Sequence, residues 1–316
     1  MHYFINYILP FLLLLLAEVL YFKIALHFKI IDKPNARSSH QVPTIRGGGI
    51  IFILGVLLFY FWHGYRLPYL LVALLISGII SFVDDVRTLP NWVKFAAHAV
   101  SVILIFRECE ILTILHPLYL LAIGILAIGI INAYNFMDGI NGITGLYSLA
   151  VIIPLFITEQ DETTRSLQLF SIMALIVFNY FNTRVNAVCF AGDVGSISMS
   201  ILIVYLLIQR IVQTSDFTYI GMLLIYGIDS CFTILHRVIQ RENIFKPHRK
   251  HLYQFLSNEK RMSQLLVSFI FASLQFIISL FIVFHYVDLT ALVVIFIALT
   301  LVYWFIKTPY LKLTRA

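Results

Sequence analysis

Long apolar runs separated by short polar segments make up almost the whole of this 316-residue chain. A helix needs roughly 20 residues to cross the hydrocarbon core of a bilayer, and eleven runs approach that length, although several are short or touch their neighbours. They are 3–27, 48–64, 68–83, 92–106, 113–131, 139–158, 167–181, 195–210, 217–236, 264–286 and 288–306. Because lipid offers no partners for backbone polar groups, the pattern predicts an all-α polytopic membrane bundle of about 10–11 transmembrane helices.

The composition supports this class. Hydrophobic residues make up 60% of the chain and charged residues 12%, whereas in soluble domains about 25% of the residues are charged. The first run has no basic start and no small-residue cleavage site, so we expect it to remain as a span and not to be a signal peptide. We expect one integral-membrane domain over residues 1–316, in which the longest polar stretch, about 237–263, carries structure of its own.

Basic residues predict the orientation. An odd number of spans places the termini on opposite sides of the membrane. Eighteen of the 22 Lys and Arg residues then fall on one side, and the other side holds only Arg66, Arg107, Arg165 and Arg210. Because cytoplasmic loops carry the excess of Lys and Arg, the N-terminus is expected outside and the C-terminus in the cytoplasm. The net charge of +6 then reflects topology and anionic lipid, and calls for no nucleic acid.

Acidic motifs lie at the cytoplasmic ends of several runs. Asp84 and Asp85 close the third run, Asp138 joins the fifth to the sixth, and Asp193 begins the eighth. Any one of them alone is as often an ordinary interfacial charge as a functional residue. The neighbouring residues favour a functional role over an ordinary interfacial charge, because each aspartate is adjacent to Gly, Asn or a second Asp. All of them are also expected on the same face of the membrane. The pattern therefore indicates an enzyme site at the membrane surface.

The spacing of these residues suggests different roles. Adjacent helical residues point about 100° apart, so Asp84 and Asp85 are not expected to face one metal ion in the same way. Asn132, Asn135 and Asp138 recur every third residue, which would align their oxygens along one side of a helix end. Asp193, which follows a glycine, resembles a helix N-cap. Such a helix start is also a site for anions such as phosphate.

Oxygen ligands from carboxylates and amides favour Mg²⁺, with Mn²⁺ as an alternative, and a nucleoside diphosphate as the substrate. The sequence Pro247-His248-Arg249-Lys250-His251 adds cationic and imidazole donors suited to such a ligand. A zinc site formed by these histidines lacks a third ligand nearby. Lys94 and His98 are four residues apart and so share one face of a helix. They either bind a lipid phosphate or only extend to the membrane interface, and the sequence favours neither interpretation.

Five segments together resemble one enzyme family in order along nearly the whole chain. They are Asp32 to Gly49, Asp84–Asp85, Asn132 to Gly142, Phe190 to Ser196, and Pro247 to Gln254. This order resembles the polyprenyl-phosphate N-acetylhexosamine-1-phosphate transferases of the glycosyltransferase family 4 type. That family includes the phospho-MurNAc-pentapeptide translocase and the enterobacterial GlcNAc-1-phosphate transferase.

The resemblance implies transfer of a sugar-1-phosphate, from an N-acetylhexosamine or a derivative, out of a UDP-sugar onto undecaprenyl phosphate, with release of UMP. It implies a site on the cytoplasmic face of a bacterial inner membrane and the start of a lipid-linked cell-surface glycan. By this resemblance Asp193 and Asn135 would bind the metal, and Asp84, Asp85 and Asp138 would be catalytic. The substrate-binding residues would be Asn132, Asn135, Lys94, His248, Arg249 and His251.

Two positions depart from the family pattern. Asn141 stands where many relatives carry another Asp, and Thr88 where an acidic residue, Asn or Lys is common. The first inner loop is closer to the branch that initiates polysaccharides and O-antigens. Two other function classes compete: a polytopic transporter without transferase activity, using Glu18, Asp229 and His236, and a scaffold for glycan assembly. A homodimer is left open.

Overall fold

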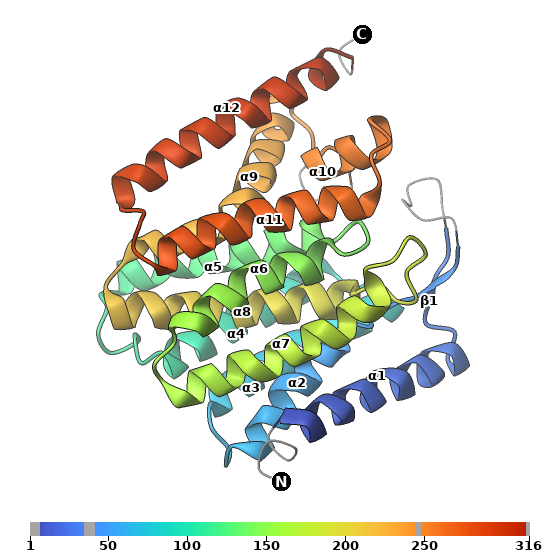
Figure 1. Ribbon diagram of the computed structural model, residues 1–316, viewed down its shortest axis with the longest axis vertical. Helices are drawn as coiled ribbons and strands as arrows, with labels where there is room; N and C mark the ends of the chain where they lie inside the picture. The colour runs from blue at the N-terminus through green and yellow to red at the C-terminus, as the bar shows by residue number, and fades with distance from the viewer. Residues whose placement is uncertain (1–6, 35–41, 244–247, 314–316) are drawn as a thin grey trace.

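A computed structural model describes residues 7–34, 42–243 and 248–313. The inner-loop residues 35–41 and Pro247, which belong to the motifs above, lie outside the described residues. The elements are α1 Leu9–His27, β1 Ile31–Asp32, β2 Thr44–Ile45, α2 Ile50–Trp62, α3 Pro68–Val86, α4 Asn91–Glu108, α5 Pro117–Met137, α6 Ile143–Thr158, α7 Glu162–Asn182, α8 Gly192–Thr214, η2 Phe217–Leu223, α9 Leu224–Ile239, α10 Leu252–Gln254, η3 Phe255–Glu259, α11 Gln264–Val283 and α12 Leu289–Leu313. Figure 1 shows the long helices lying roughly side by side.

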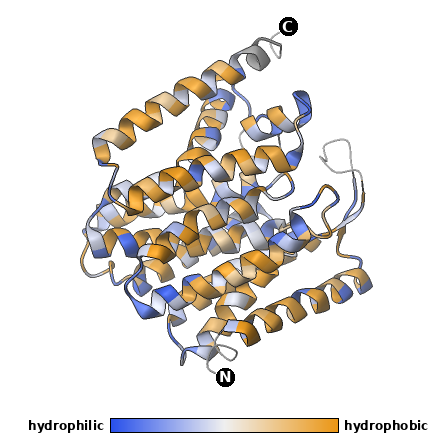
Figure 2. Cartoon of the chain, viewed as in Figure 1, coloured by the Kyte–Doolittle hydropathy of each residue, from blue (hydrophilic) through white to orange (hydrophobic). Residues whose placement is uncertain are grey.

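The predicted fold class is confirmed, since each of the eleven apolar runs coincides with a helix of the bundle. Within the described residues, eight helical segments are long and apolar enough to span a membrane, counting η2 and α9 as one, and α2 and α6 are shorter. The remaining run, α4, carries Lys94, Arg107 and Glu108. The helix bodies are hydrophobic along most of their length, and hydrophilic residues gather mainly toward their ends (Figure 2).

Helix α8 lies at the centre of the bundle. Every residue from Val194 to Leu207 is buried, and α8 packs against α3, α5, α2 and α6. A helix that is apolar on all sides must be covered either by protein neighbours or by lipid. By contrast, only 11% of the apolar part of α12, Leu289–Thr308, is buried. Most of this helix therefore faces outward, as expected for contact with lipid. Because Val194 to Leu207 of α8 are all buried, the neighbouring helices fix the position of the N-terminus of α8.

The first inner loop is joined to the segment before α8 by backbone hydrogen bonds. Ile45 N donates to Val188 O at 3.3 Å, Gly48 N to Phe190 O at 2.8 Å and Gly49 N to Ala191 O at 3.0 Å. The contact is so close that a Cβ on Gly49 would lie 2.2 Å from Gly195 Cα, which only glycine tolerates. Two motifs that are far apart in the sequence therefore form one structural unit.

Candidate functional site

Asp85 caps the start of α8. Its two carboxylate oxygens accept hydrogen bonds from the backbone N–H groups of Asp193 at 2.9 Å and Val194 at 3.0 Å. The first N–H groups of a helix lack partners within the helix, and a carboxylate placed there supplies acceptors and complements the helix dipole. The N-cap residue itself, Ala191, provides no side-chain bond. The suggestion that Asp193 is the N-cap is therefore wrong, and its carboxylate is free of that task.

Arg46 connects the carboxylates. Its Nε lies 2.8 Å from Asp85 Oδ1, and its Nη2 lies 4.0 Å from Asp193 Oδ1. The Asp85 side chain is fully buried, whereas the Arg46 side chain keeps 35% of its surface exposed. A guanidinium carries five N–H donors, so the exposed part of Arg46 retains donors for an anionic ligand. The loop is fixed by Tyr21, whose hydroxyl donates to Arg46 O at 2.5 Å.

Gly192 permits this approach. Its φ of +70° is rarely adopted by other residues, and a Cβ there would lie 2.6 Å from Asp85 Oδ2 and 3.0 Å from Gly47 Cα. Any side chain at Gly192 would thus push α3 and the inner loop away from α8.

Asp193 meets two further predicted residues. Its side chain contacts those of Asn135 and Asp84, and Asn135 Nδ2 donates to Ser196 Oγ at 3.0 Å. Two carboxylates in contact repel each other unless a proton or a cation lies between them. The structure therefore brings Asp84, Asn135 and Asp193 from three helices into one oxygen-rich cluster.

Lys94 lies on the other side of Asp84. Lys94 Nζ donates to Asp84 Oδ2 at 2.9 Å, and the backbone N–H of Leu89 donates to Asp84 Oδ1 at 2.6 Å. His98, one turn along α4, is buried, and its Nδ1 has no hydrogen-bond partner in the described part of the chain. The two adjacent aspartates differ in their contacts: Asp85 contacts Arg46 and the first N–H groups of α8, and Asp84 contacts Lys94 and the Asp193 side chain.

Asp138 follows α5 and accepts a hydrogen bond from Thr144 Oγ1 at 2.6 Å. Burial, opposed by the Thr144 hydrogen bond and reinforced by Asp193, raises the pKa of Asp138 to about 7. A group with such a pKa can hold or release a proton near neutral pH. Asn132 Nδ2 donates to Ile128 O of its own helix at 2.8 Å.

Asn141 has a structural task that an aspartate could not perform. It is buried, and its Nδ2 donates to Arg184 O at 2.8 Å and Val185 O at 3.2 Å. A carboxylate at this position would turn acceptor oxygens toward two carbonyl oxygens. Asn141 therefore fixes the loop between α7 and α8 beside the cluster.

The described segment 248–263, which contains the predicted substrate-binding residues His248, Arg249 and His251, is called the basic loop below. It packs against the end of α5. The His248 and His251 rings are stacked, with centroids 4.9 Å apart, and each lies 6.4 Å from the Phe136 ring. Tyr253 anchors the loop, because its hydroxyl donates to Phe136 O at 3.0 Å and would collide with any Cβ on Gly139. Since Phe136 adjoins Asn135, the predicted substrate-binding loop flanks the carboxylate cluster.

Two groups of this loop are suited to a ligand. Burial, followed by the positive charges around it, lowers the pKa of His248 to about 3, so its imidazole is neutral at physiological pH. Arg249 Nη2 is buried and has no hydrogen-bond partner among the residues that the structure describes. A buried charged donor without a partner is costly, and an anionic ligand would satisfy it.

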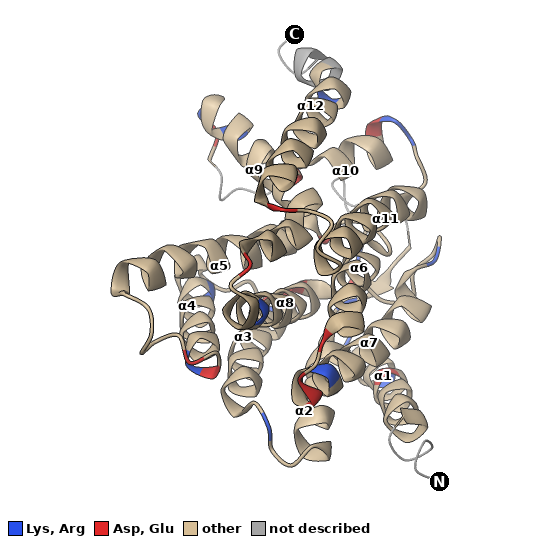
Figure 3. Cartoon of the chain, turned by 60° about the vertical axis from the view of Figure 1, so that its left-hand side comes forward, with Lys and Arg blue, Asp and Glu red and all other residues tan. Residues whose placement is uncertain are grey.

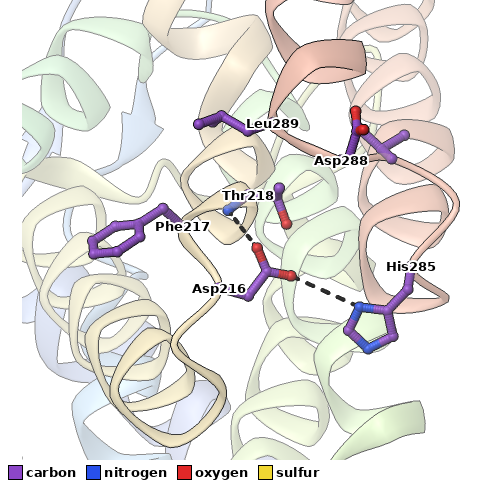
Figure 4. A pocket seen from close by; sticks show the side chains of 7 residues that line it. Asp216, Phe217, Thr218, His285, Asp288 and Leu289 are labelled. Carbon is purple, nitrogen blue, oxygen red and sulfur yellow. Dashed lines mark hydrogen bonds and ion pairs between the residues drawn. The ribbon is translucent and has the colours of Figure 1, made fainter.

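A separate pocket of about 370 Å³ lies between the start of η2 and the turn from α11 to α12 (Figure 4). Its carboxylates are engaged as caps: Asp216 accepts from Thr218 N at 2.9 Å, and Asp288 accepts from Ala291 N at 2.7 Å. His285 Nδ1 lies 3.7 Å from Asp216. These residues belong to the opposite helix ends from the carboxylate cluster, and their polar groups stabilise turns.

Charged residues in the described part of the chain lie mostly at helix ends and in loops (Figure 3). Arg46 and Tyr253 are the neighbours that the site prediction omitted. Arg46 could have been noticed as the cation directly before three glycines, a segment that allows close approach of backbones. Nothing in the spacing indicated that Tyr253 would insert beside Gly139.

Known proteins resemble this chain over most of its length. Residues 67–211 match the glycosyl transferase family 4 domain, a stretch that begins just before α3 and contains Asp84, Asp85, Asn135, Asp138 and Asp193. The chain is 26% identical over 300 residues to a probable undecaprenyl-phosphate N-acetylglucosaminyl 1-phosphate transferase of Bacillus subtilis, covering 85% of this chain and 82% of the relative.

Two further relatives carry related names. An undecaprenyl-phosphate alpha-N-acetylglucosaminyl 1-phosphate transferase of Salmonella typhi is 24% identical over 264 residues, covering 74% of this chain and 71% of the relative. A phospho-N-acetylmuramoyl-pentapeptide-transferase of Dictyoglomus thermophilum is 26% identical over 216 residues, covering 63% and 70% respectively. The expected resemblance is confirmed: residues 67–211 match glycosyl transferase family 4, and the relatives over most of the chain are transferases of the expected kind.

Proposed function

We propose that this protein transfers a sugar-1-phosphate from a UDP-sugar to undecaprenyl phosphate at the cytoplasmic ends of its helices. The observation that carries the proposal is the meeting of Asp84, Asn135 and Asp193 at the ends of apolar helices, where Arg46 joins Asp193 to Asp85. A soluble anionic donor and a membrane-bound isoprenoid acceptor can meet only at such an interface. The relatives named above are transferases of this kind, and none is a transporter.

The transporter interpretation depends on Glu18, Asp229 and His236 being available within the membrane. Glu18 is fully buried and lies 3.7 Å from Cys189 Sγ, and Asp229 binds the basic loop. Transporter sites are typically formed near the midplane by broken helices, whereas the polar cluster here lies at helix ends.

In the proposed reaction an oxygen of the lipid phosphate attacks the β-phosphorus of the UDP-sugar. The bond between that phosphorus and the bridging oxygen breaks, and its electron pair leaves with UMP. A new diphosphate then links the lipid to the sugar. Lys94 and Asp84 would position the acceptor phosphate and its proton, and Asp138 would orient the donor or exchange a proton. Arg46 would offer its exposed donors to the phosphates, as arginine commonly does.

A divalent cation fits the cluster. The described residues contain no group of three or more His, Cys, Asp or Glu placed to hold a metal, but Mg²⁺ usually takes only one or two carboxylates and fills its shell with water and phosphates. Asp193 and Asn135 would hold the ion, with Asp84 beside them, and Asp85 is already engaged by α8 and Arg46. When bound, Mg²⁺ neutralises charge on the donor diphosphate.

The experiment that tests this function is turnover by the purified protein in detergent. We expect nucleotide release from UDP-N-acetylglucosamine or a related UDP-sugar only when undecaprenyl phosphate and Mg²⁺ or Mn²⁺ are both present. EDTA should stop turnover, and added Mg²⁺ should restore it. Turnover that ignores the lipid, or that survives EDTA, would contradict the proposed reaction.

The basic loop should affect donor binding. His248→Ala and Arg249→Ala are expected to raise KM for the UDP-sugar by about 10- to 150-fold, the value of one charge-assisted hydrogen bond, with little change in KM for the lipid. Lys260→Ala, at an exposed position of the same loop, is the control and should leave both constants unchanged. If the two variants weaken only the lipid, the loop binds the acceptor instead.

The orientation can be tested by cysteine labelling. In a background with serine at the three native cysteines, Asn243→Cys should react with an impermeant maleimide only after the cells are permeabilised. The reason is that the excess of basic residues predicts a cytoplasmic position for this loop. Glu110→Cys, in the connection between α4 and α5, should react in intact cells. The reverse pattern would place the site on the outer face.

A further inference from the structure

A buried carboxylate lies behind the basic loop. Asp229, on α9, is 1% exposed. Its Oδ1 accepts from Leu252 N at 2.7 Å, and its Oδ2 accepts from Tyr253 N at 3.3 Å. The same Oδ1 lies 3.5 Å from His251 Nδ1. Asp229 therefore contacts the loop both through the backbone and through the imidazole that the sequence assigns to substrate binding.

A lysine from another helix, Lys307 of α12, is linked to this carboxylate through Thr233. Thr233 Oγ1 donates to Asp229 Oδ1 at 3.2 Å, and Lys307 Nζ donates to Thr233 Oγ1 at 2.8 Å and also contacts Tyr303 OH. Lys307 is 1% exposed, although it lies on α12, most of which faces outward. A buried charge is tolerated only when it is paired and hydrogen-bonded. The pairing of Lys307 with Asp229 through Thr233 thus explains why both charges are present.

The arrangement gives the His251 ring one orientation. The ring is stacked on His248 and on Tyr253, with centroid distances of 4.9 Å and 5.7 Å. Its Nδ1 lies nearest to Asp229 Oδ1, at the 3.5 Å given above, and both Nδ1 and Nε2 are buried without a hydrogen-bond partner within the described ranges. A carboxylate beside one ring nitrogen favours the proton on that nitrogen and leaves the other nitrogen for a ligand. A phosphate or hydroxyl group of the donor is the chemistry that Nε2 would bind.

We propose that Asp229 is a positioning residue that orients His251 toward the sugar nucleotide, and that Lys307 and Thr233 hold Asp229 in place. This inference rests on the proposed function, because it assigns His251 to the donor. It connects α12, which contributes no residue to the carboxylate cluster, to the substrate through three side chains.

A purely structural reading makes a different prediction. If Asp229 only holds the loop by accepting two backbone N–H groups, its loss should lower stability and activity whether or not His251 is present. If it acts through His251, its effect on the donor should vanish once His251 is removed. Coupling between two residues is measured by a double-mutant cycle.

The experiment compares wild type, Asp229→Asn, His251→Ala and the double variant by kcat/KM for the UDP-sugar and by Tm. Each single change should lower kcat/KM by about 10- to 150-fold, and the double variant should be no worse than His251→Ala. Asp229→Glu should recover part of the loss. Losses that multiply in the double variant would overturn the proposal, even with an active wild type. A wild type that never turns over would instead contradict the proposed function, and the inference with it.

Two further variants keep the test decisive. If Asp229→Asn does not fold, Thr233→Val retains the carboxylate and removes its link to Lys307, and the same cycle with His251→Ala applies. Gln275→Met is the matched control, because Gln275 is fully buried and accepts from Tyr147 OH at 2.7 Å in another polar network. It should lower Tm without changing KM for the donor. If Gln275→Met changes donor KM as much as Thr233→Val does, the effect is general destabilisation and the proposal fails.

Discussion

Asp193→Asn is expected to abolish turnover while the protein remains folded in detergent. The start of α8 is capped by Asp85, so the Asp193 carboxylate is not needed to hold the helix. The amide keeps the shape of the side chain and removes the negative charge that would face Mg²⁺. Loss of one group that stabilises transition-state charge costs about 10²–10³-fold in kcat, and loss of the main metal ligand should cost at least as much.

Metal binding provides a measurement of Asp193 that does not depend on activity. In the wild type, Mg²⁺ should raise Tm, because a ligand that binds only the folded state stabilises it. In Asp193→Asn this rise should disappear, while Tm without metal stays near the wild-type value. A variant that turns over at a near wild-type rate, or that keeps the full response to Mg²⁺, would show that Asp193 does not bind the metal.

Asp85→Asn should lower both activity and stability, which separates it from Asp193→Asn. The Asp85 side chain is fully buried, accepts from two backbone N–H groups and pairs with Arg46. An amide has a single acceptor oxygen and no charge, so it would lose one of these hydrogen bonds and the ion pair. Loss of one charge-assisted hydrogen bond costs about 1.5–3 kcal/mol. We expect a clear fall in Tm and about a 10- to 150-fold fall in kcat, measured by thermal unfolding and nucleotide release.

Asp161→Asn is the matched control for Asp85→Asn. Asp161 caps α7 by accepting from Thr164 N at 2.7 Å, and it lies at the helix end opposite to the carboxylate cluster. This change should lower Tm slightly and leave kcat unchanged. If Asp85→Asn resembled Asp161→Asn, with a normal kcat, Asp85 would not position the site.

The spans could be predicted from the sequence because each apolar run is long, but their ends could not. The run 113–131 corresponds to α5, which continues to Met137. Two polar residues before Asp138 have partners on other helices, Tyr134 in Ser148 and Asn135 in Ser196, and Asn132 bonds to Ile128 O of α5 itself. The helix therefore continues through this polar segment. The run 217–236 begins instead as the 3₁₀ segment η2 before α9 starts at Leu224. Hydrophobicity alone does not distinguish these helix types.

The sequence predicted which residues form the candidate site, but it did not predict which groups each of them contacts. The glycines and carboxylates of the motifs indicated which residues would meet, and the structure brings Asp84, Asn135 and Asp193 together. That Asp85 rather than Asp193 caps α8 depends on how α3 packs against α8, which no local pattern encodes. The same holds for Asp229, which lies far from the basic loop in sequence and contacts it only through folding.

The two products of the reaction test the central claim most directly. Purified protein given a UDP-sugar and undecaprenyl phosphate should release UMP, and mass spectrometry of the lipid should show a sugar joined through a diphosphate, because the β-phosphorus moves with the sugar. Release of UDP together with a sugar joined through a single phosphate would mean that the sugar carbon is attacked instead, and would contradict the account.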